Sequence, residues 1–281
     1  MLTLSSTQDI CTIRDGVLLP TWKEAAKKHD SKRQHVQIQL FFSDSHCKCN
    51  VACLDQQLTF DDVLSMDQRF VYVTSFAVEP CDQHWSTYPV FPVDRIPGML
   101  AYVALFPLDR LIINLGNGLL SGLRKTIFDC LAVYKNNLEP VLLDIRYCSE
   151  ADSFLRAQLK STNLRQLRVL GVWPPSVNNA LEDFVRQPQF EDLLCPDFQC
   201  FDRLAIMRLE AHWRWMSLYN HPLKTAHVVM KPHPYLMNEF YIALGRQQTN
   251  PYKFYIFHHA KKPCLWVDFV NFNCYLDLCI D

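Results

Sequence analysis

The chain has 281 residues, of which 49% are hydrophobic and 20% are charged, and its formal net charge is −1 at pH 7. This apolar content is enough for a sizeable buried core, and the small net charge excludes the basic field that nucleic acid or an anionic membrane requires. Its apolar runs fall short of the ~20 residues of a membrane span, and the first residues lack the pattern of a secretory signal. We therefore expect an intracellular protein, cytoplasmic or nuclear, with neither nucleic acid nor membrane as a partner.

The 12 cysteines fit an intracellular location. Without a secretory signal, reduced thiols are expected rather than a disulfide framework. Several of them lie inside apolar runs, where cysteine packs as a small hydrophobic residue. These are Cys53, Cys130, Cys148 and Cys264.

The first third of the chain divides into two predicted regions. Residues 1–34 carry one short helical stretch that starts near Pro20, includes Trp22 and ends in basic residues, as the helix dipole favours. Alternation of apolar and polar residues then predicts strands at 35–42, 49–54 and 69–78. We therefore expect residues 35–93 to form a small antiparallel sheet, which ends in a proline-rich connector at 81–98.

Residues 94–281 repeat one pattern, a short apolar strand followed by a helix with one apolar face. The strands are predicted at 108–115, 140–147, 164–172 and 190–195. Their centres lie about 24 to 32 residues apart, around the 20–29-residue period of leucine-rich repeats, although the asparagine ladder of those repeats is missing. A weaker fifth strand is expected at 223–230, and strands at 252–259 and 264–270 are expected to close the region as a cap.

Together these patterns predict an α/β fold, with a small N-terminal antiparallel sheet followed by degenerate leucine-rich-repeat-like β–α units. A single unit cannot bury its apolar face alone, so we expect neighbouring units to stack and bury these faces against each other. Ser149, with Asp152 three residues later, predicts a capping box at one helix start. A doubly wound α/β enzyme would also alternate strands and helices, so an enzyme with an unrecognised active site stays as the alternative.

Motifs that carry chemistry are absent or badly spaced. Gly116, Gly118 and Gly122 follow a strand, but their spacing is not that of a dinucleotide-binding loop, and a strand-to-helix turn explains them. Residues 46–53 (HCKCNVAC) gather three thiols and an imidazole, yet a zinc site requires a second ligand pair that the sequence does not supply. We therefore assign no catalytic residue, no cofactor and no metal, and expect a protein that is not an enzyme.

The outward face of the repeat strands is the remaining candidate site. Alternation along a strand should bury the leucines and turn Asp144, Arg146 and Arg168 outward. With Tyr147 they would line the surface that stacked repeats use to hold a partner. These four residues are therefore the expected contacts of a protein partner.

Several stretches together resemble the large nematode family of F-box proteins and their associated C-terminal region. TWKEAAKKH is similar to the last F-box helix, and LTFDDVLSMDQRFVYVTSFAV resembles the helix and strand that follow in the family. VDRIPGMLAYVALFPLDRLIINL resembles the step into the first repeat. The most specific piece is the run from 151 to 195, with its G-x-W-P turn and final F-x-x-L-x-C.

The resemblance implies a non-enzymatic adaptor. In such proteins the F-box docks on a Skp-type linker of a cullin ubiquitin ligase, and the C-terminal region holds the target. Trp22 would then belong to the contact with the linker, and residues 1–34 would be a partial F-box. An F-box has three helices, and residues 1–34 are too short for all of them. The alternative is therefore a free-standing binding protein that has lost the ligase link.

Overall fold

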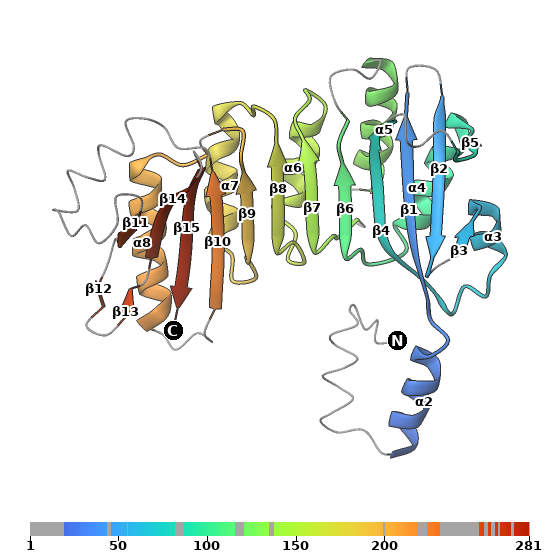
Figure 1. Cartoon of the computed structure of the whole chain (residues 1–281), viewed down its shortest axis with the longest axis horizontal. Helices are drawn as coiled ribbons and strands as arrows, with labels where there is room; N and C mark the ends of the chain where they lie inside the picture. Colours follow the sequence, from blue (N-terminus) through green and yellow to red (C-terminus); the bar gives the residue numbers. More distant parts are fainter. Residues whose placement is uncertain are drawn as a thin grey trace. The chain divides into compact units, whose positions relative to one another are not determined.

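The computed structural model divides the chain into two units by residue contacts, residues 1–140 and 141–281 (Figure 1). It describes residues 20–43, 46–54, 56–81, 87–115, 121–134, 138–198, 200–218, 224–230, 253–255, 258–259, 262–263, 265–270 and 273–280. The boundary expected between residues 93 and 94 falls inside the first unit, because strands on either side of it pair with each other.

The first unit contains a mixed sheet with strand order β6-β4-β1-β2-β3, and β5 also pairs with β2. Its strands are β1 (Gln34–Phe42), β2 (Cys47–Cys53), β3 (Gln56–Leu58), β4 (Val71–Pro80), β5 (Val90–Phe91) and β6 (Arg110–Ile113). Its helices are α2 (Pro20–Asp30), α3 (Phe60–Ser65), α4 (Ile96–Val103) and α5 (Ser121–Tyr134), with a 3-10 turn, η2 (Val93–Arg95), before α4.

The direction of β4 corrects the expected antiparallel sheet. β1 and β2 form the predicted antiparallel hairpin, with Val36 opposite Cys53 and Phe42 opposite Cys47. β4, however, runs parallel to β1, and β6 runs parallel to β4. The chain between β2 and β4 carries both β3 and α3, and this length allows the crossover that parallel neighbours require. The prediction of an all-antiparallel sheet was therefore wrong.

The second unit contains strands in the order β7-β8-β9-β10-β15-β14-β11, of which the first four run parallel and the others antiparallel. Its strands are β7 (Leu142–Arg146), β8 (Gln166–Leu170), β9 (Asp192–Cys195), β10 (Lys224–Met230), β11 (Lys253–Tyr255), β14 (Leu265–Val270) and β15 (Asn273–Ile280), with a separate pair β12 (His258–His259) and β13 (Lys262–Pro263). Its helices are α6 (Ala151–Gln158), α7 (Asn178–Val185) and α8 (Arg203–Leu218), with a 3-10 turn, η3 (Pro175–Val177), before α7. The predicted α/β class, the fifth strand and the closing strand at 264–270 are thus confirmed. The closing strand expected over 252–259 is instead two short strands, β11 and β12, which belong to different sheets.

The core of the second unit lies between its strands and its helices, which cover one face of the strands (Figure 1). The inward residues of β7, β8 and β9 have no exposed surface: Leu143, Ile145, Leu167, Val169, Leu193 and Cys195. The apolar faces of α6 and α7 meet them, with Leu155, Leu181 and Phe184 also fully buried. The alternation read from the sequence is therefore realised on these strands. In the part of the chain that is described, no helix is long and apolar enough to cross a membrane.

The start of α6 departs from the expected capping box. The backbone is already helical at Glu150, which is the N-cap, and no side chain caps the helix. The hydroxyl of Ser149 therefore lies one residue too early and donates to the Glu150 carboxylate at 2.8 Å. The Asp152 carboxylate accepts a hydrogen bond from Nε of Arg156 one turn later, also at 2.8 Å. The capping-box prediction was wrong, because the N-cap is Glu150 and the Asp152 carboxylate pairs with Arg156 within the helix.

Contacts between the β8–α7 unit and the β9–α8 unit recur at a separation of 26 residues. Nη1 of Arg165 lies 3.1 Å from Oε1 of Glu191, and the Gly171 amide donates to Oδ2 of Asp197 at 2.5 Å. The strand register follows nearly the same step, because Gln166 is opposite Asp192 across β8 and β9. This shared step means that these two units contact each other through equivalent positions, as stacked units must. The preceding pair has a register step of 24 residues.

The G-x-W-P turn after β8 has a structural explanation. Gly171 has a φ of 79°, which lies in the left-handed region that residues with a Cβ disfavour. A Cβ added there would lie 3.4 Å from Cβ of Tyr147. The turn directs Trp173 inward, where only 3% of it is exposed and its indole N–H donates to the Leu170 carbonyl at 2.9 Å.

We therefore predict that Gly171→Ala lowers the free energy of unfolding by about 1–2 kcal/mol, the cost of a left-handed conformation for a residue with a Cβ. Urea denaturation followed by tryptophan fluorescence measures this loss. Gly98→Ala is the matched control, because Gly98 is exposed in α4 and nothing lies within 4 Å of its added Cβ. An equal loss in both variants would contradict the explanation from φ.

Candidate functional site

The candidate site is the face of β7, β8 and β9 that points away from the helices, which we call the open strand face. Its residues are half-buried, in alternation with the fully buried ones. They are Leu142, Asp144, Arg146, Gln166, Arg168, Leu170, Asp192 and Leu194. Four of these eight side chains are charged, so this face is not part of an apolar core.

The strand register brings the expected charged residues together. Asp144 on β7 is directly opposite Arg168 on β8, and Arg146 is directly opposite Leu170. Arg168 is in turn opposite Leu194 on β9. Side chains at directly opposite and diagonal positions are within reach of one another. Asp144, Arg146 and Arg168 therefore form one cluster, bordered by two leucines; its binding role stays a prediction.

Two facing members of this cluster, Asp144 and Arg168, each have one buried polar atom without a hydrogen-bond partner among the described residues, Oδ1 and Nε respectively. A buried donor without an acceptor costs about 1–3 kcal/mol, and more when the group is charged. Among the described residues, the Nε of Arg168 therefore carries this cost at the centre of the open strand face.

Tyr147 lies at the carboxyl end of β7, beside the cluster. Its backbone N–H donates to the carbonyl of Leu170 at 2.9 Å, which fixes its position next to β8. Its ring packs edge-on against the buried Trp173, with 5.1 Å between the ring centroids. Val172, which is 71% exposed, adds an apolar side chain at this end of the strands. Tyr147 is thus held in place while remaining half-exposed.

Trp22 lies within α2, as expected, but its side chain is outside the described residues. Gly116, Gly118 and Cys264, which the sequence analysis also named, lie outside the described residues.

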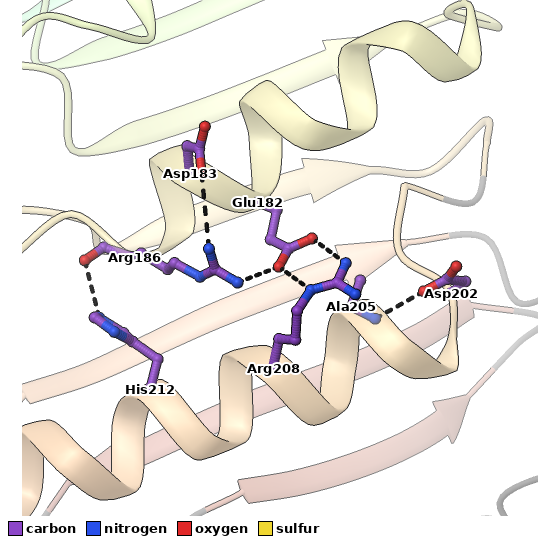
Figure 2. A network of polar contacts seen from close by, with 7 residues as sticks. All are labelled: Glu182, Asp183, Arg186, Asp202, Ala205, Arg208 and His212. Atoms are coloured by element: carbon purple, nitrogen blue, oxygen red, sulfur yellow. Dashed lines mark hydrogen bonds and ion pairs between the residues drawn. The ribbon is translucent and has the colours of Figure 1, made fainter.

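A second polar cluster joins α7 to α8 and was not predicted from the sequence (Figure 2). The Glu182 side chain is only 7% exposed, and its carboxylate accepts two hydrogen bonds from Arg208, at 2.8 Å and 2.7 Å. Arg186 donates to the same carboxylate, and its carbonyl lies 3.2 Å from Nε2 of His212. Each contact between the helices spans 26 residues, like those around the strands. An alignment of the β8–α7 and β9–α8 sequences with an offset of 26 residues would have placed Glu182 opposite Arg208 and could have predicted this contact.

Electrostatics in this cluster is typical of a structural ion-pair network. The hydrogen bond from Arg208, helped by the nearby charge of Arg186, lowers the pKa of Glu182 below its usual value. Burial lowers the pKa of His212. Glu182 therefore stays ionised at neutral pH and holds two guanidinium groups, which makes it a link between helices rather than a proton donor.

The thiols of the HCKCNVAC segment lie on the buried side of β2. Cys47, Cys49 and Cys53 alternate with half-buried residues, and burial raises the pKa of both Cys47 and Cys49 to about 12. Such thiols stay protonated at neutral pH and pack as small apolar groups. Cys148 is also buried, and Cys130 is half-buried. Within those ranges, no group of three His, Cys, Asp or Glu residues is placed to hold a metal ion.

Comparisons with family models, with curated proteins and with solved structures found no match to this chain.

We predict that Glu182→Gln lowers the free energy of unfolding by about 2 kcal/mol at pH 7, because it removes charged hydrogen bonds to two arginines. Denaturation at a series of pH values measures this. The folded chain holds the pKa of Glu182 below its unfolded value of 4.5, so the stabilisation is full above pH 4.5 and is lost as pH falls through the folded pKa. The difference between native chain and variant should therefore shrink in acid.

Asp183→Asn is the matched control for this prediction. Asp183 is on the same helix, its side chain is 77% exposed, and it contacts Arg186 only at 3.8 Å. Its loss should change stability by less than about 0.5 kcal/mol. Equal effects of the two variants, or a difference that grows in acid, would contradict the structural role of Glu182.

Proposed function

We propose that the chain is a non-enzymatic protein-interaction module that holds its partner on the open strand face. One observation carries the proposal: β7, β8 and β9 are covered by helices on one face, while the other presents half-buried charged and aliphatic side chains. A parallel sheet in an α/β enzyme is normally covered on both faces. A sheet with one open face is typical of stacked repeats, which bind proteins there.

We propose further that β7 to β9 and their helices are degenerate leucine-rich-repeat-like units. The strand register steps by 24 residues from Leu142 to Gln166 and by 26 from Gln166 to Asp192, both within the period of such repeats. Hydrogen bonds between the β8–α7 and β9–α8 units keep the 26-residue step, and the helices lie on one side of the strands. These features support stacking of equivalent units.

The family resemblance supports a more specific proposal, that the module recruits substrates to a Skp–cullin–F-box ubiquitin ligase. Residues 1–34, with Trp22 in α2, would contact the Skp-type linker, and the open strand face would hold the protein to be ubiquitylated. A free-standing binding protein without the ligase link would use the same face and differ only in the linker contact.

Alanine at both Arg146 and Arg168 should reduce partner capture at least tenfold and leave the fold intact, because both side chains are on the surface of the sheet. Quantitative mass spectrometry of proteins that co-purify with each chain measures this, and circular dichroism checks the fold. Arg69→Ala with Lys125→Ala removes two exposed cations of the first unit and is the control. Undiminished capture by a folded Arg146/Arg168 variant would contradict the proposal.

The ligase link is tested by binding of the full chain, tagged at its C-terminus, to a purified Skp-type linker. An F-box protein with all three F-box helices is the positive control. We expect the native chain to bind and Trp22→Ala to weaken binding at least tenfold, because a tryptophan anchor carries much of an interface's energy. If the native chain does not bind, the ligase link is refuted and the free-standing binder remains.

A further inference from the structure

The segment that leads from α2 into β1, in the first unit, carries an excess of positive charge. Residues 27–35 contain four lysines and arginines and one aspartate, whereas the whole chain has a formal net charge of −1. Lys27, Lys28 and Lys32 are exposed, and Arg33 is half-buried. None of these four cations forms an ion pair with a described residue. All four are therefore open to an anion from outside the chain.

Asp67 lies beside this segment but does not balance it. Its carboxylate accepts hydrogen bonds from Nε and Nη2 of Arg69, at 2.9 Å and 2.6 Å. These hydrogen bonds, with the nearby charge of Lys32, hold the pKa of Asp67 at about 2. Asp67 and Arg69 thus form an ionised pair without net charge. The excess of positive charge on residues 27–35 remains.

Two aromatic rings hold part of this charge in place. Phe70 and Tyr72 lie on either side of the buried Val71 and are both half-buried, so their rings share the less buried side of the chain. Nζ of Lys32 lies 5.3 Å from the centroid of the Phe70 ring, and Cζ of Arg33 lies 5.7 Å from that of Tyr72. A cation over an aromatic face is attracted to it but keeps its charge. The rings therefore position two cations without neutralising them.

The surroundings of the rings decide which polyanion fits. A single-stranded nucleic acid binds a basic surface by stacking its bases on aromatic faces. Here the chain itself surrounds both rings, because His29 lies 5.1 Å from Phe70 and His35 lies 5.6 Å from Tyr72, between ring centroids. Carboxylates need only the cations and no free ring. The arrangement therefore favours an acidic protein segment over a nucleic acid.

We infer that Lys27, Lys28, Lys32 and Arg33, which we call the α2–β1 basic surface, bind a segment of a partner protein that is rich in aspartate and glutamate. Cations already held over rings lose less freedom on binding, which favours affinity. Opposite charge on the partner speeds association and excludes basic or neutral segments. This contact does not depend on the open strand face. It also differs from the proposed contact of Trp22, which lies at the opposite end of α2.

The test measures binding of a fluorescein-labelled dodecapeptide of alternating glutamate and serine to the full chain by fluorescence anisotropy. We expect binding that weakens as salt is added, because exposed charges are screened. The double variant Lys32→Gln/Arg33→Gln should raise the dissociation constant at least tenfold. Lys32→Arg/Arg33→Lys keeps both charges and should bind nearly as the native chain does. A peptide of alternating glutamine and serine should not bind.

The matched control is Lys125→Gln/Lys160→Gln, which removes the same charge from two exposed lysines elsewhere and should leave binding unchanged. Lys27→Gln/Lys28→Gln tests the surface without touching the ring contacts and should also weaken binding, so the inference stays testable if the first variant misfolds by circular dichroism. No binding by the native chain, or equal losses in the control and the surface variants, would overturn the inference. Tighter binding of an oligothymidylate, or of vesicles of phosphatidylcholine and phosphatidylserine, that the surface variants abolish would also overturn it, because the partner would then be a nucleic acid or a membrane.

Discussion

The second unit depends on the burial of one side of β7, β8 and β9 beneath their helices. Side chains alternate along a strand, so a shift of register by one residue would exchange the buried leucines for Asp144 and Arg168. The apolar rows at Leu143, Leu167 and Leu193 therefore determine which residues face outward. The same constraint aligns successive units, and the contacts repeated at 26 residues, such as that of Glu182 with Arg208, hold the helix layer in that alignment.

The sequence predicted what its periodicity encodes. Alternation placed the strands, and a row such as Val177, Leu181 and Phe184 placed a helix face that is fully buried. Alternation carries no information on direction, because β4 has the same pattern whether it runs parallel or antiparallel to β1. Contacts between units, such as that of Glu182 with Arg208, could not be predicted either. A glutamate in a helix is expected to be exposed to solvent unless its partners are known. The missing acceptor of Arg168 depends on three-dimensional surroundings that spacing alone does not give.

The two sides of the strands have different side-chain compositions. On the helix side, the carboxylate of Glu182 has almost no exposed surface and holds two arginines. The open side instead presents half-buried charged and aliphatic side chains. Single polar atoms without a hydrogen-bond partner among the described residues occur on both sides, at Nε of Arg186 and at Nε of Arg168. If the open strand face binds a partner as proposed, changes on the helix layer should act on stability and changes on that face on recognition.

Photo-crosslinking from defined positions tests most directly whether the open strand face is where a partner binds. A benzoylphenylalanine would replace Leu194 on that face in one chain, and Asp183 on the outer surface of α7 in another. After irradiation in cell extract, the account predicts discrete crosslinked proteins from position 194 that are absent from position 183. Crosslinks from position 183 alone, or the same set from both positions, would contradict the account, because the partner would then not distinguish the strands from the helices.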